Sequence, residues 1–233
     1  MLQNSNLTGA DTISIDKALT KEKGWKYLLL SFGAFLAMCL EFVHTYIWEP
    51  FVFGNELTTW QTISHWMITS LTWGAAAYLL VCIAKNKLGF DILTKGKKMK
   101  LWQVSAALFG IVISILAIYL HWGEFRVVME YNNGLLLMFF QYIYYLAETL
   151  LILLIIIFAQ KALEIWTKKR NLPWGGIICG LTFGIVHFIS SGEVDIPRGI
   201  FATVSGFFFG AAYLFTNRDF KKSWLILYLM FAF

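Results

Sequence analysis

The sequence predicts an all-α protein, a polytopic transmembrane helical bundle of six full spans plus a short C-terminal hydrophobic helix. Three observations support this fold class. Hydrophobic residues make up 58% of the 233 residues and charged residues only 14%, whereas soluble domains carry about 25% charged residues. Apolar runs close to the roughly 20 residues that a membrane-crossing helix needs recur along the chain. Basic residues cluster between these runs.

The apolar runs predict a single membrane domain over residues 25–233, preceded by a flexible or surface-lying cytoplasmic tail over residues 1–24. We expect Pro50 to end the first helix region, because proline interrupts helical hydrogen bonding. The last run has 11 residues, too few to cross a bilayer unaided. The predicted helices are Lys26–Ile47, Ile63–Ala84, Leu101–Leu120, Leu135–Ala159, Pro173–Ile189, Gly199–Phe215 and Ser223–Phe233.

The distribution of basic residues predicts the orientation in the membrane. If the N-terminus is cytoplasmic, 17 of the 19 Lys and Arg residues lie on the cytoplasmic side, and Arg126 and Arg198 are the two exceptions. This is the positive-inside pattern of multi-pass proteins. We therefore interpret the net charge of +5 as a topology signal in a bacterial cytoplasmic membrane. It predicts membrane lipid as a partner and no nucleic acid.

The three cysteines predict neither a disulfide framework nor a zinc site. Cys39, Cys82 and Cys179 all fall inside predicted spans, without the paired spacing that such sites require. We expect them to be small core residues, and we expect no cofactor.

The fourth apolar run carries a polar stripe. Gln141, Tyr144, Tyr145 and Glu148 stand at positions i, i+3, i+4 and i+7 and so share one face of a helix. A charged side chain in a membrane helix costs roughly 2.5–3.5 kcal/mol on insertion scales, so Glu148 marks a paired or functional group. The stripe either lines a site in the bundle or forms a hydrogen-bonded cluster that fixes helix packing.

The fifth run combines a face of small residues with His187, and the sixth repeats the small face. Small residues every four positions allow close helix packing. Counted from the cytoplasmic boundary, Glu148 lies about 18 Å and His187 about 20 Å deep on antiparallel neighbours, so they can meet. We expect the two small-faced helices to flank the polar one. The small residues are Gly176, Gly180 and Gly184, then Ala202, Gly206 and Gly210.

Glu41 and His44 form a second polar pair near the end of the first span. They are three residues apart and share a helical face. The pair either sits at the outer interface beside aromatic residues or adds to a site inside the bundle. A depth of about 23 Å would allow Glu41 to join Glu148.

The C-terminal part, from about residue 141 to 233, resembles the CAAX-protease and bacteriocin-processing family of membrane proteins. Phe183 and His187 match the Phe-x-x-x-His motif of that family, and Glu148, 39 residues upstream, matches its acidic position. Ala147 stands where the family has a first glutamate, and Met230 stands near the position of a later histidine. The resemblance implies the fold and, for an active member, an intramembrane endopeptidase.

In such an enzyme a desolvated glutamate acts as general base toward water, and an imidazole orients the water or stabilises the oxyanion. The resemblance assigns these roles to Glu148 and His187. Phe183, Tyr144, Tyr145, Glu41 and His44 are the candidate residues that line the site or contact substrate. Tyr144, Tyr145 and His44 are the candidate replacement donors to the oxyanion.

Three functional interpretations remain open. The first is an intramembrane CAAX prenyl protease-like hydrolase that cuts a membrane-associated peptide or protein. The second is a catalytically inactive relative that acts as a membrane binding, bacteriocin immunity or scaffold protein. The third is a metal-binding membrane protein, because Glu41, His44, Glu148 and His187 offer two carboxylates and two imidazoles, a set known to hold iron or zinc.

Overall fold

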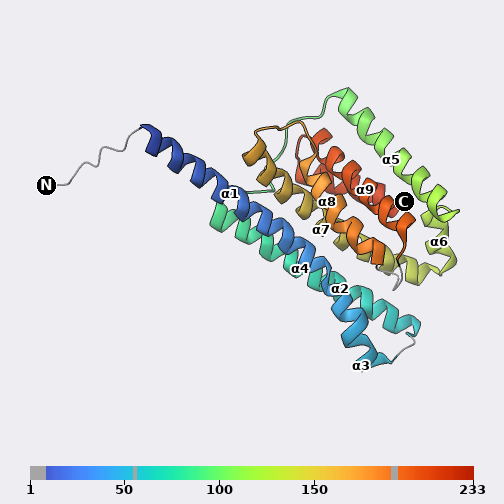
Figure 1. The fold of residues 1–233 in the computed structure, drawn as a ribbon. Helices are drawn as coiled ribbons and strands as arrows, with labels where there is room; N and C mark the ends of the chain where they lie inside the picture. The colour runs from blue at the N-terminus through green and yellow to red at the C-terminus, as the bar shows by residue number, and fades with distance from the viewer. Residues whose placement is uncertain (1–8, 55–56, 190–193) are drawn as a thin grey trace.

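Helix α7 (Leu135–Thr167) lies at the centre of the computed structural model, and the other helices pack around it (Figure 1). The structure describes residues 9–54, 57–189 and 194–233. Within those ranges every regular element is helical and no strand occurs. Helix α7 contacts α1, α4, α8 and α10. Nine consecutive residues from Leu151 to Ala159 are at most 2% exposed, as expected for a helix that is apolar on all sides and enclosed by neighbours.

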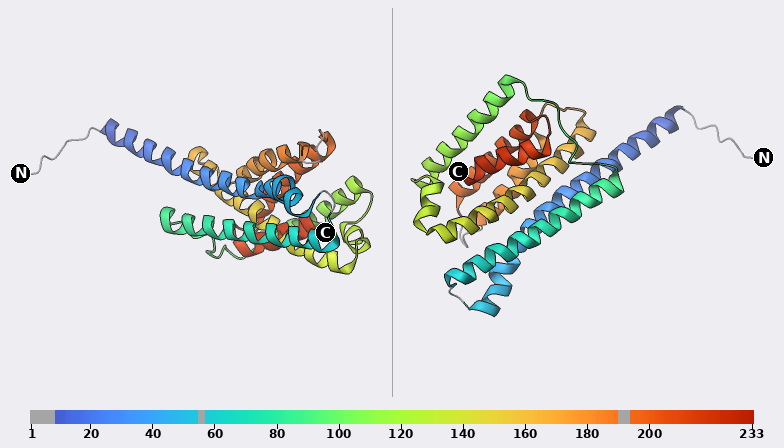
Figure 2. Two further views of the ribbon diagram at one scale, coloured as in Figure 1. Left: turned by 90° about the horizontal axis from the view of Figure 1, so that it is seen from below. Right: turned by 180° about the vertical axis from the view of Figure 1, so that it is seen from behind.

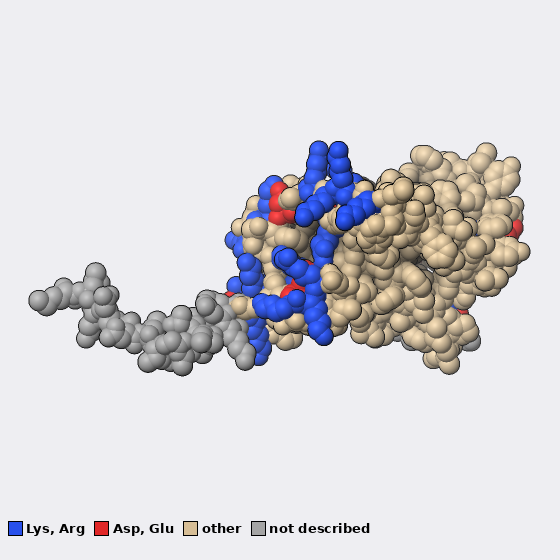
Figure 3. All heavy atoms as spheres, turned by 90° about the horizontal axis from the view of Figure 1, so that it is seen from above, with Lys and Arg blue, Asp and Glu red and all other residues tan. Residues whose placement is uncertain are grey.

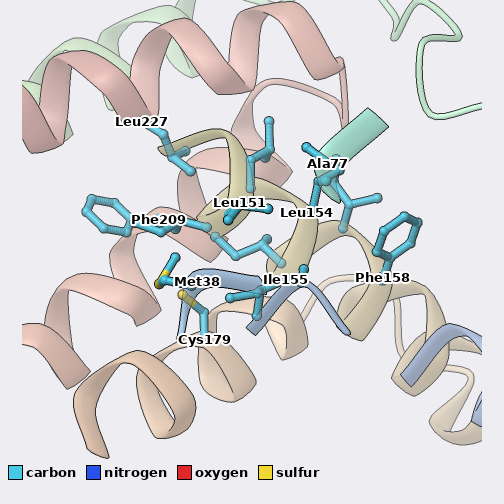
Figure 4. Close-up of a cluster of buried hydrophobic side chains, with 14 of the residues drawn as sticks. Met38, Ala77, Leu151, Leu154, Ile155, Phe158, Cys179, Phe209 and Leu227 are labelled. Carbon is cyan, nitrogen blue, oxygen red and sulfur yellow. The ribbon is translucent and has the colours of Figure 1, made fainter. Parts of the chain in front are cut away.

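The core surrounds this buried stretch of α7. Leu151, Leu154 and Ile155 of α7 project toward side chains from five other helices (Figure 4). These neighbours are Met38 of α1, Ala77 of α4, Cys179 of α8, Phe209 of α9 and Leu227 of α10. Burial of a large aliphatic side chain contributes about 1.5–3 kcal/mol when the reference is water, so this layer holds the described helices together around α7.

Within the described ranges, five helical stretches are long and apolar enough to cross a membrane, as expected for a membrane helical bundle, so the six full spans that the sequence predicts are not confirmed. The fifth predicted span forms α8 (Trp174–Ile189), whose 16 residues reach about 24 Å, less than the roughly 30 Å of a bilayer core. The five stretches are Thr20–Phe53, Thr59–Leu88, Leu101–Trp122, Leu135–Thr167 and Ile196–Phe215.

The first span is longer and less regular than the sequence predicts. Helix α1 (Gly9–Met38) begins inside the predicted tail, so residues 9–24 are helical, while residues 1–8 lie outside the described ranges. After a turn at Cys39 the chain continues through α2 (Leu40–Val43), a π-helical turn η1 (His44–Trp48) and α3 (Glu49–Phe53). Pro50 does not end the helix as predicted. It lies in the first turn of α3, where its missing N–H is not needed.

The next two elements follow the sequence closely. Helix α4 (Thr59–Leu88) starts at a capping box made by Thr58 and Gln61 and ends at Gly89, whose φ of 64° closes the helix. Figure 2 shows α4 running alongside α1 in both views. Helix α5 (Leu101–Trp122) lies at the edge of the bundle against α9 and α10, and the short α6 (Arg126–Asn132) leads back to α7.

The small faces of α8 and α9 (Ile196–Phe215) pack directly on each other, which differs from the expected arrangement on either side of α7. A Cβ atom on Gly180 would lie 2.5 Å from the Thr203 carbonyl oxygen, and one on Gly206 would lie 2.5 Å from the Gly180 nitrogen. These separations leave no room for a side chain, so glycine permits the contact. Helix α10 (Phe220–Ala232) then covers α7 and α5.

The basic side chains gather at one end of the bundle, which we call the basic end (Figure 3). It comprises the loop from Phe90 to Lys100, the α7–α8 turn and the α9–α10 turn. Asn217 and Asp219 of the last turn fasten the loop, because the Asn217 amide donates to the Lys98 carbonyl and Asp219 accepts from the Gly96 N–H. The turns at this end are therefore tied to one another.

Candidate functional site

A cavity of about 430 Å³ lies near the opposite end of the bundle, between α1–α2, α6, α7 and α8. We call it the polar cavity, because many polar and ionisable side chains line it. Most of these side chains belong to apolar helices. A polar cavity of this size in a membrane bundle is the expected location of a binding or catalytic site. Its polar lining residues are Glu41, Thr45, Arg126, Glu130, Gln141, Tyr144, Tyr145, Glu148, His187 and Arg198.

Helix α7 contributes the polar stripe seen in the sequence. Gln141, Tyr144, Tyr145 and Glu148 all line the polar cavity. The structure also places Glu41, Phe183 and His187 on its wall. The depth comparison therefore agrees with the structure, since Glu148 of α7 and His187 of α8 share one cavity.

His44 does not line the polar cavity, contrary to the expected role in the site. Its Nδ1 atom lies 3.1 Å from the Thr69 hydroxyl of α4. Glu41 is also directed toward α4, where its carboxylate lies 3.9 Å from His65 Nε2. The side chains of Glu41 and His44 thus share a face, as their spacing predicts, and that face is directed toward α4. Glu41 also lines the polar cavity, whereas His44 does not. His44 is therefore not available as a donor there.

The three cavity glutamates differ in their hydrogen bonds. Tyr144 donates its hydroxyl to Glu41, and Tyr145 donates to Glu130, both in short contacts. The hydroxyl hydrogens of both tyrosines are therefore already used within the protein. Across the described ranges no hydrogen bond or ion pair reaches the Glu148 carboxylate. Glu148 is the cavity carboxylate available to a ligand or a water molecule.

The imidazole of His187 is held by its own helix. Its Nδ1 atom lies 2.8 Å from the Phe183 carbonyl oxygen, and the two rings pack with centroids 4.2 Å apart. A carbonyl oxygen only accepts hydrogen bonds, so we assign the Nδ1 hydrogen to this contact. In the neutral ring Nε2 is then an acceptor. The Phe-x-x-x-His spacing thus fixes the ring and its tautomer at the same time.

Two arginines complete the wall, and sequence reasoning did not assign them to the site. Arg126 donates from Nη1 to the Phe231 carbonyl at 2.6 Å and lies over the rings of Tyr145 and Phe231. Arg198 lies over Trp122, and its buried Nε has no hydrogen-bond partner. Arg126 and Arg198 are the two basic residues outside the positive-inside pattern. That exception is the sequence signal that could have identified them as site residues.

A second group was also missed, a buried pair of Glu49 and His65 next to the cavity. His65 Nδ1 makes a short contact with the Glu49 carboxylate, whose side chain is 4% exposed. The Nε2 atom of the same ring faces the Glu41 carboxylate, and this carboxylate accepts a hydrogen bond from the Tyr144 hydroxyl. These contacts link α3, α4, α2 and α7. Both ionisable groups lie close to the ends of predicted spans, and the sequence analysis did not consider them as site residues.

The metal interpretation receives no geometric support. Among the described residues, no three His, Cys, Asp or Glu side chains are grouped so that they could hold a metal ion. The four candidate ligands are divided, because His44 contacts Thr69 while Glu41, Glu148 and His187 line the polar cavity.

Comparisons with known proteins add no family assignment: no family model, curated protein or solved structure matches this chain. The resemblance noted above therefore rests on the motif residues and their spacing alone.

Proposed function

We propose that this chain is a membrane-embedded endopeptidase in which Glu148 is the general base and His187 the orienting group. The observation that carries the proposal is the free carboxylate of Glu148, in a cavity where Glu41 and Glu130 are both bonded by tyrosines. A general base must be able to reach a water molecule and take its proton. The spacing of Glu148, Phe183 and His187, which resembles the CAAX-protease family, supports the same roles.

The proposed step is hydrolysis of a peptide bond. Glu148 takes a proton from water, the resulting hydroxide attacks the carbonyl carbon, and the proton passes to the leaving amine as the C–N bond breaks. His187 Nε2 accepts a hydrogen bond from the attacking water and so orients it. Because the tyrosine hydroxyls are used elsewhere, Arg126 is the cationic group that we assign to stabilise the oxyanion.

We propose further that the N-terminus and the basic end lie in the cytoplasm, and that the polar cavity lies toward the outer leaflet. The clustering of Lys and Arg at one end supports this orientation (Figure 3). In a chain whose three native cysteines are replaced by serine, Lys98→Cys and Glu124→Cys place single labels at opposite ends. An impermeant maleimide should label Glu124→Cys in intact cells and Lys98→Cys only after lysis. The reverse pattern would show that the orientation is inverted.

The test of the peptidase is a comparison of membrane-protein N-termini in cells that produce the native chain or the Glu148→Gln variant. New N-termini should appear with the native chain and be absent with Glu148→Gln. Glu124→Gln is the matched control, because Glu124 lies outside the cavity and accepts only from Asn132. Equal amounts of folded protein must be shown by size-exclusion chromatography. Identical N-termini from the native chain and Glu148→Gln would refute the proposal.

A second candidate function is a catalytically inactive relative that binds a membrane peptide or protein in the same cavity. The observation that favours it is Met230, a buried thioether near the position where the resemblance leads one to expect a histidine. Under this proposal Glu148→Ala and His187→Ala keep the cellular phenotype. Gly180→Leu removes it by separating α8 from α9. Loss of the phenotype in both alanine variants would exclude this candidate.

A further inference from the structure

A second cavity, of about 170 Å³, adjoins the polar cavity between α5, α8, α9 and α10. We call it the apolar crevice. Ile113 and Ala117 of α5 form one wall, and Val204 and Phe208 of α9 form another. Val204 and Phe208 are 49% and 45% exposed, so this wall continues onto the outer surface of the bundle. The crevice is too small for a whole lipid, so only part of an acyl chain fits inside it, and the exposed Val204 and Phe208 side chains extend its apolar wall to the surface.

The charged groups of the two cavities are distributed unequally. Glu41, Glu130 and Glu148 line the polar cavity, and no acidic residue of the described ranges lines the apolar crevice. Arg126 and Arg198 line both. At the crevice the arginines therefore present positive charge in a mainly apolar space that has no acidic residue of the described ranges.

The arginines also have unused hydrogen-bonding capacity. No carboxylate of the described residues lies within ion-pair distance of either guanidinium. Arg126 donates a hydrogen bond from Nη1 to a backbone carbonyl. Arg198 has a buried Nε with no hydrogen-bond partner among the described residues. A partly buried guanidinium without a paired anion is unfavourable, and guanidinium groups bind phosphate or carboxylate in bidentate geometry.

We infer that the apolar crevice binds one anionic phospholipid, with its phosphate at Arg198 and an acyl chain between α5 and α9. Trp122, under the Arg198 guanidinium, is of the residue type that lies at the level of lipid head groups. The apolar walls favour a lipid over free phosphate. This binding site does not depend on Glu148 being a catalytic residue, so either proposal can fail alone.

The experiment is native mass spectrometry of the full chain in detergent with equal amounts of phosphatidylglycerol and phosphatidylcholine. We expect phosphatidylglycerol to be retained preferentially. Arg198→Gln should lower its retention about tenfold, because glutamine cannot make the charge-assisted hydrogen bonds of the guanidinium to the phosphate. Lys98→Gln is the control, with the same change of charge at the basic end. Millimolar inorganic phosphate should not displace the bound lipid.

Ala117→Phe tests the chain-binding part without changing any charge. It fills the crevice from α5 and should lower phosphatidylglycerol retention. If Arg198→Gln does not fold, the Ala117→Phe variant alone tests whether the crevice binds the lipid. Equal retention of both lipids by the native chain would overturn the inference. So would equal losses in Arg198→Gln and Lys98→Gln, displacement by phosphate, or unchanged binding in a folded Ala117→Phe variant.

Discussion

The basic end and the polar cavity hold charged side chains in opposite ways. At the basic end Arg218 contacts Glu164 at 2.6 Å, and Lys222 contacts Asp219 at 3.3 Å. In the polar cavity, among the described residues, Glu148 and Arg198 have no partner of opposite charge within ion-pair distance. The charges of the basic end connect elements of the fold, while those of the cavity are left available to a ligand.

This difference has an energetic meaning. A paired charge loses part of its hydration but regains a favourable contact, whereas an unpaired charge in a membrane bundle only loses hydration. Removing one of these paired charges at the basic end should therefore destabilise the fold, and removing an unpaired charge from the cavity should not. The predictions below test that contrast, starting with the largest expected effect.

Glu148→Gln should lower cleavage about 10²–10⁴-fold, the usual contribution of a general base. The same variant should unfold at the same or a higher temperature, because glutamine removes an unpaired charge from the membrane interior. N-terminal analysis gives the activity, and thermal unfolding in detergent gives the stability. A folded variant with native activity, or a clear drop in unfolding temperature, would contradict the contrast.

Arg218→Met should destabilise the protein by about 2–3 kcal/mol, somewhat less than the 3–5 kcal/mol of a fully buried pair. The substitution leaves the Glu164 carboxylate without its partner, and the Glu164 side chain is only 10% exposed. It also removes the hydrogen bond that Arg218 donates to the Arg170 carbonyl. Thermal unfolding measures the effect. The double variant Arg218→Met with Glu164→Leu should recover part of the loss, since no unpaired carboxylate remains. If the single variant unfolds like the native chain, the pair does not stabilise the basic end.

Asp219 should make stability depend on pH. Burial acts to raise its pKa, but hydrogen bonds from the Lys222 and Gly96 N–H groups and from the Lys222 side chain outweigh burial and hold the pKa below the ordinary value of 3.8. This contribution is present above pH 3.8 and is lost as pH falls through the lower folded-state pKa. Asp219→Asn should be less stable than the native chain at pH 6, by about 1 kcal/mol.

The difference between these two proteins should shrink as the pH falls through the range where Asp219 titrates. Asparagine can still cap α10 through its amide oxygen, but its NH2 group cannot accept from the Gly96 N–H. The comparison therefore tests the charge of Asp219 together with its second acceptor oxygen. Thermal unfolding at several pH values gives the result. A difference that stays constant down to strongly acid pH would show that the charge of Asp219 is not responsible.

Arg198→Gln should change the free energy of unfolding by less than about 0.5 kcal/mol, the range of substitutions that break no specific interaction. The guanidinium contacts Trp122 but has no hydrogen-bond partner among the described residues. Thermal unfolding of lipid-free protein checks this expectation. A loss as large as that of Arg218→Met would show that Arg198 is part of the fold rather than a ligand-binding group.

Much of the fold followed from local pattern. The apolar runs located α4, α5, α7 and α9, because burying or embedding about 20 apolar residues leaves few alternatives to a helix. The continuation past Pro50 was not predicted, since a proline in the first turn of a new helix and one that ends a helix look alike in sequence. The short α8 was predicted as a full span, because composition shows apolarity but not depth.

The candidate site was predicted in part. The stripe on α7 placed Tyr144, Tyr145 and Glu148 on one wall, because helical periodicity decides which side chains share a face. Sequence reasoning paired Glu41 with His44, but the structure separates their partners and introduces His65 and Glu49 instead. Contacts between helices that are distant in sequence carry no local periodic signal, so only the packing of the bundle reveals them.

The sequence by itself determined that the chain forms apolar helices, that basic residues gather at one end, and that Glu148 and His187 lie at one depth. Each of these depends on composition and helical rise. Only the tertiary structure decided that two tyrosines bond Glu41 and Glu130, while Glu148 has no partner among the described residues. It also decided that Arg126 and Arg198 converge on two adjoining cavities. The physical reason is that hydrogen bonding and charge pairing depend on distances between helices, which the arrangement of the whole bundle sets.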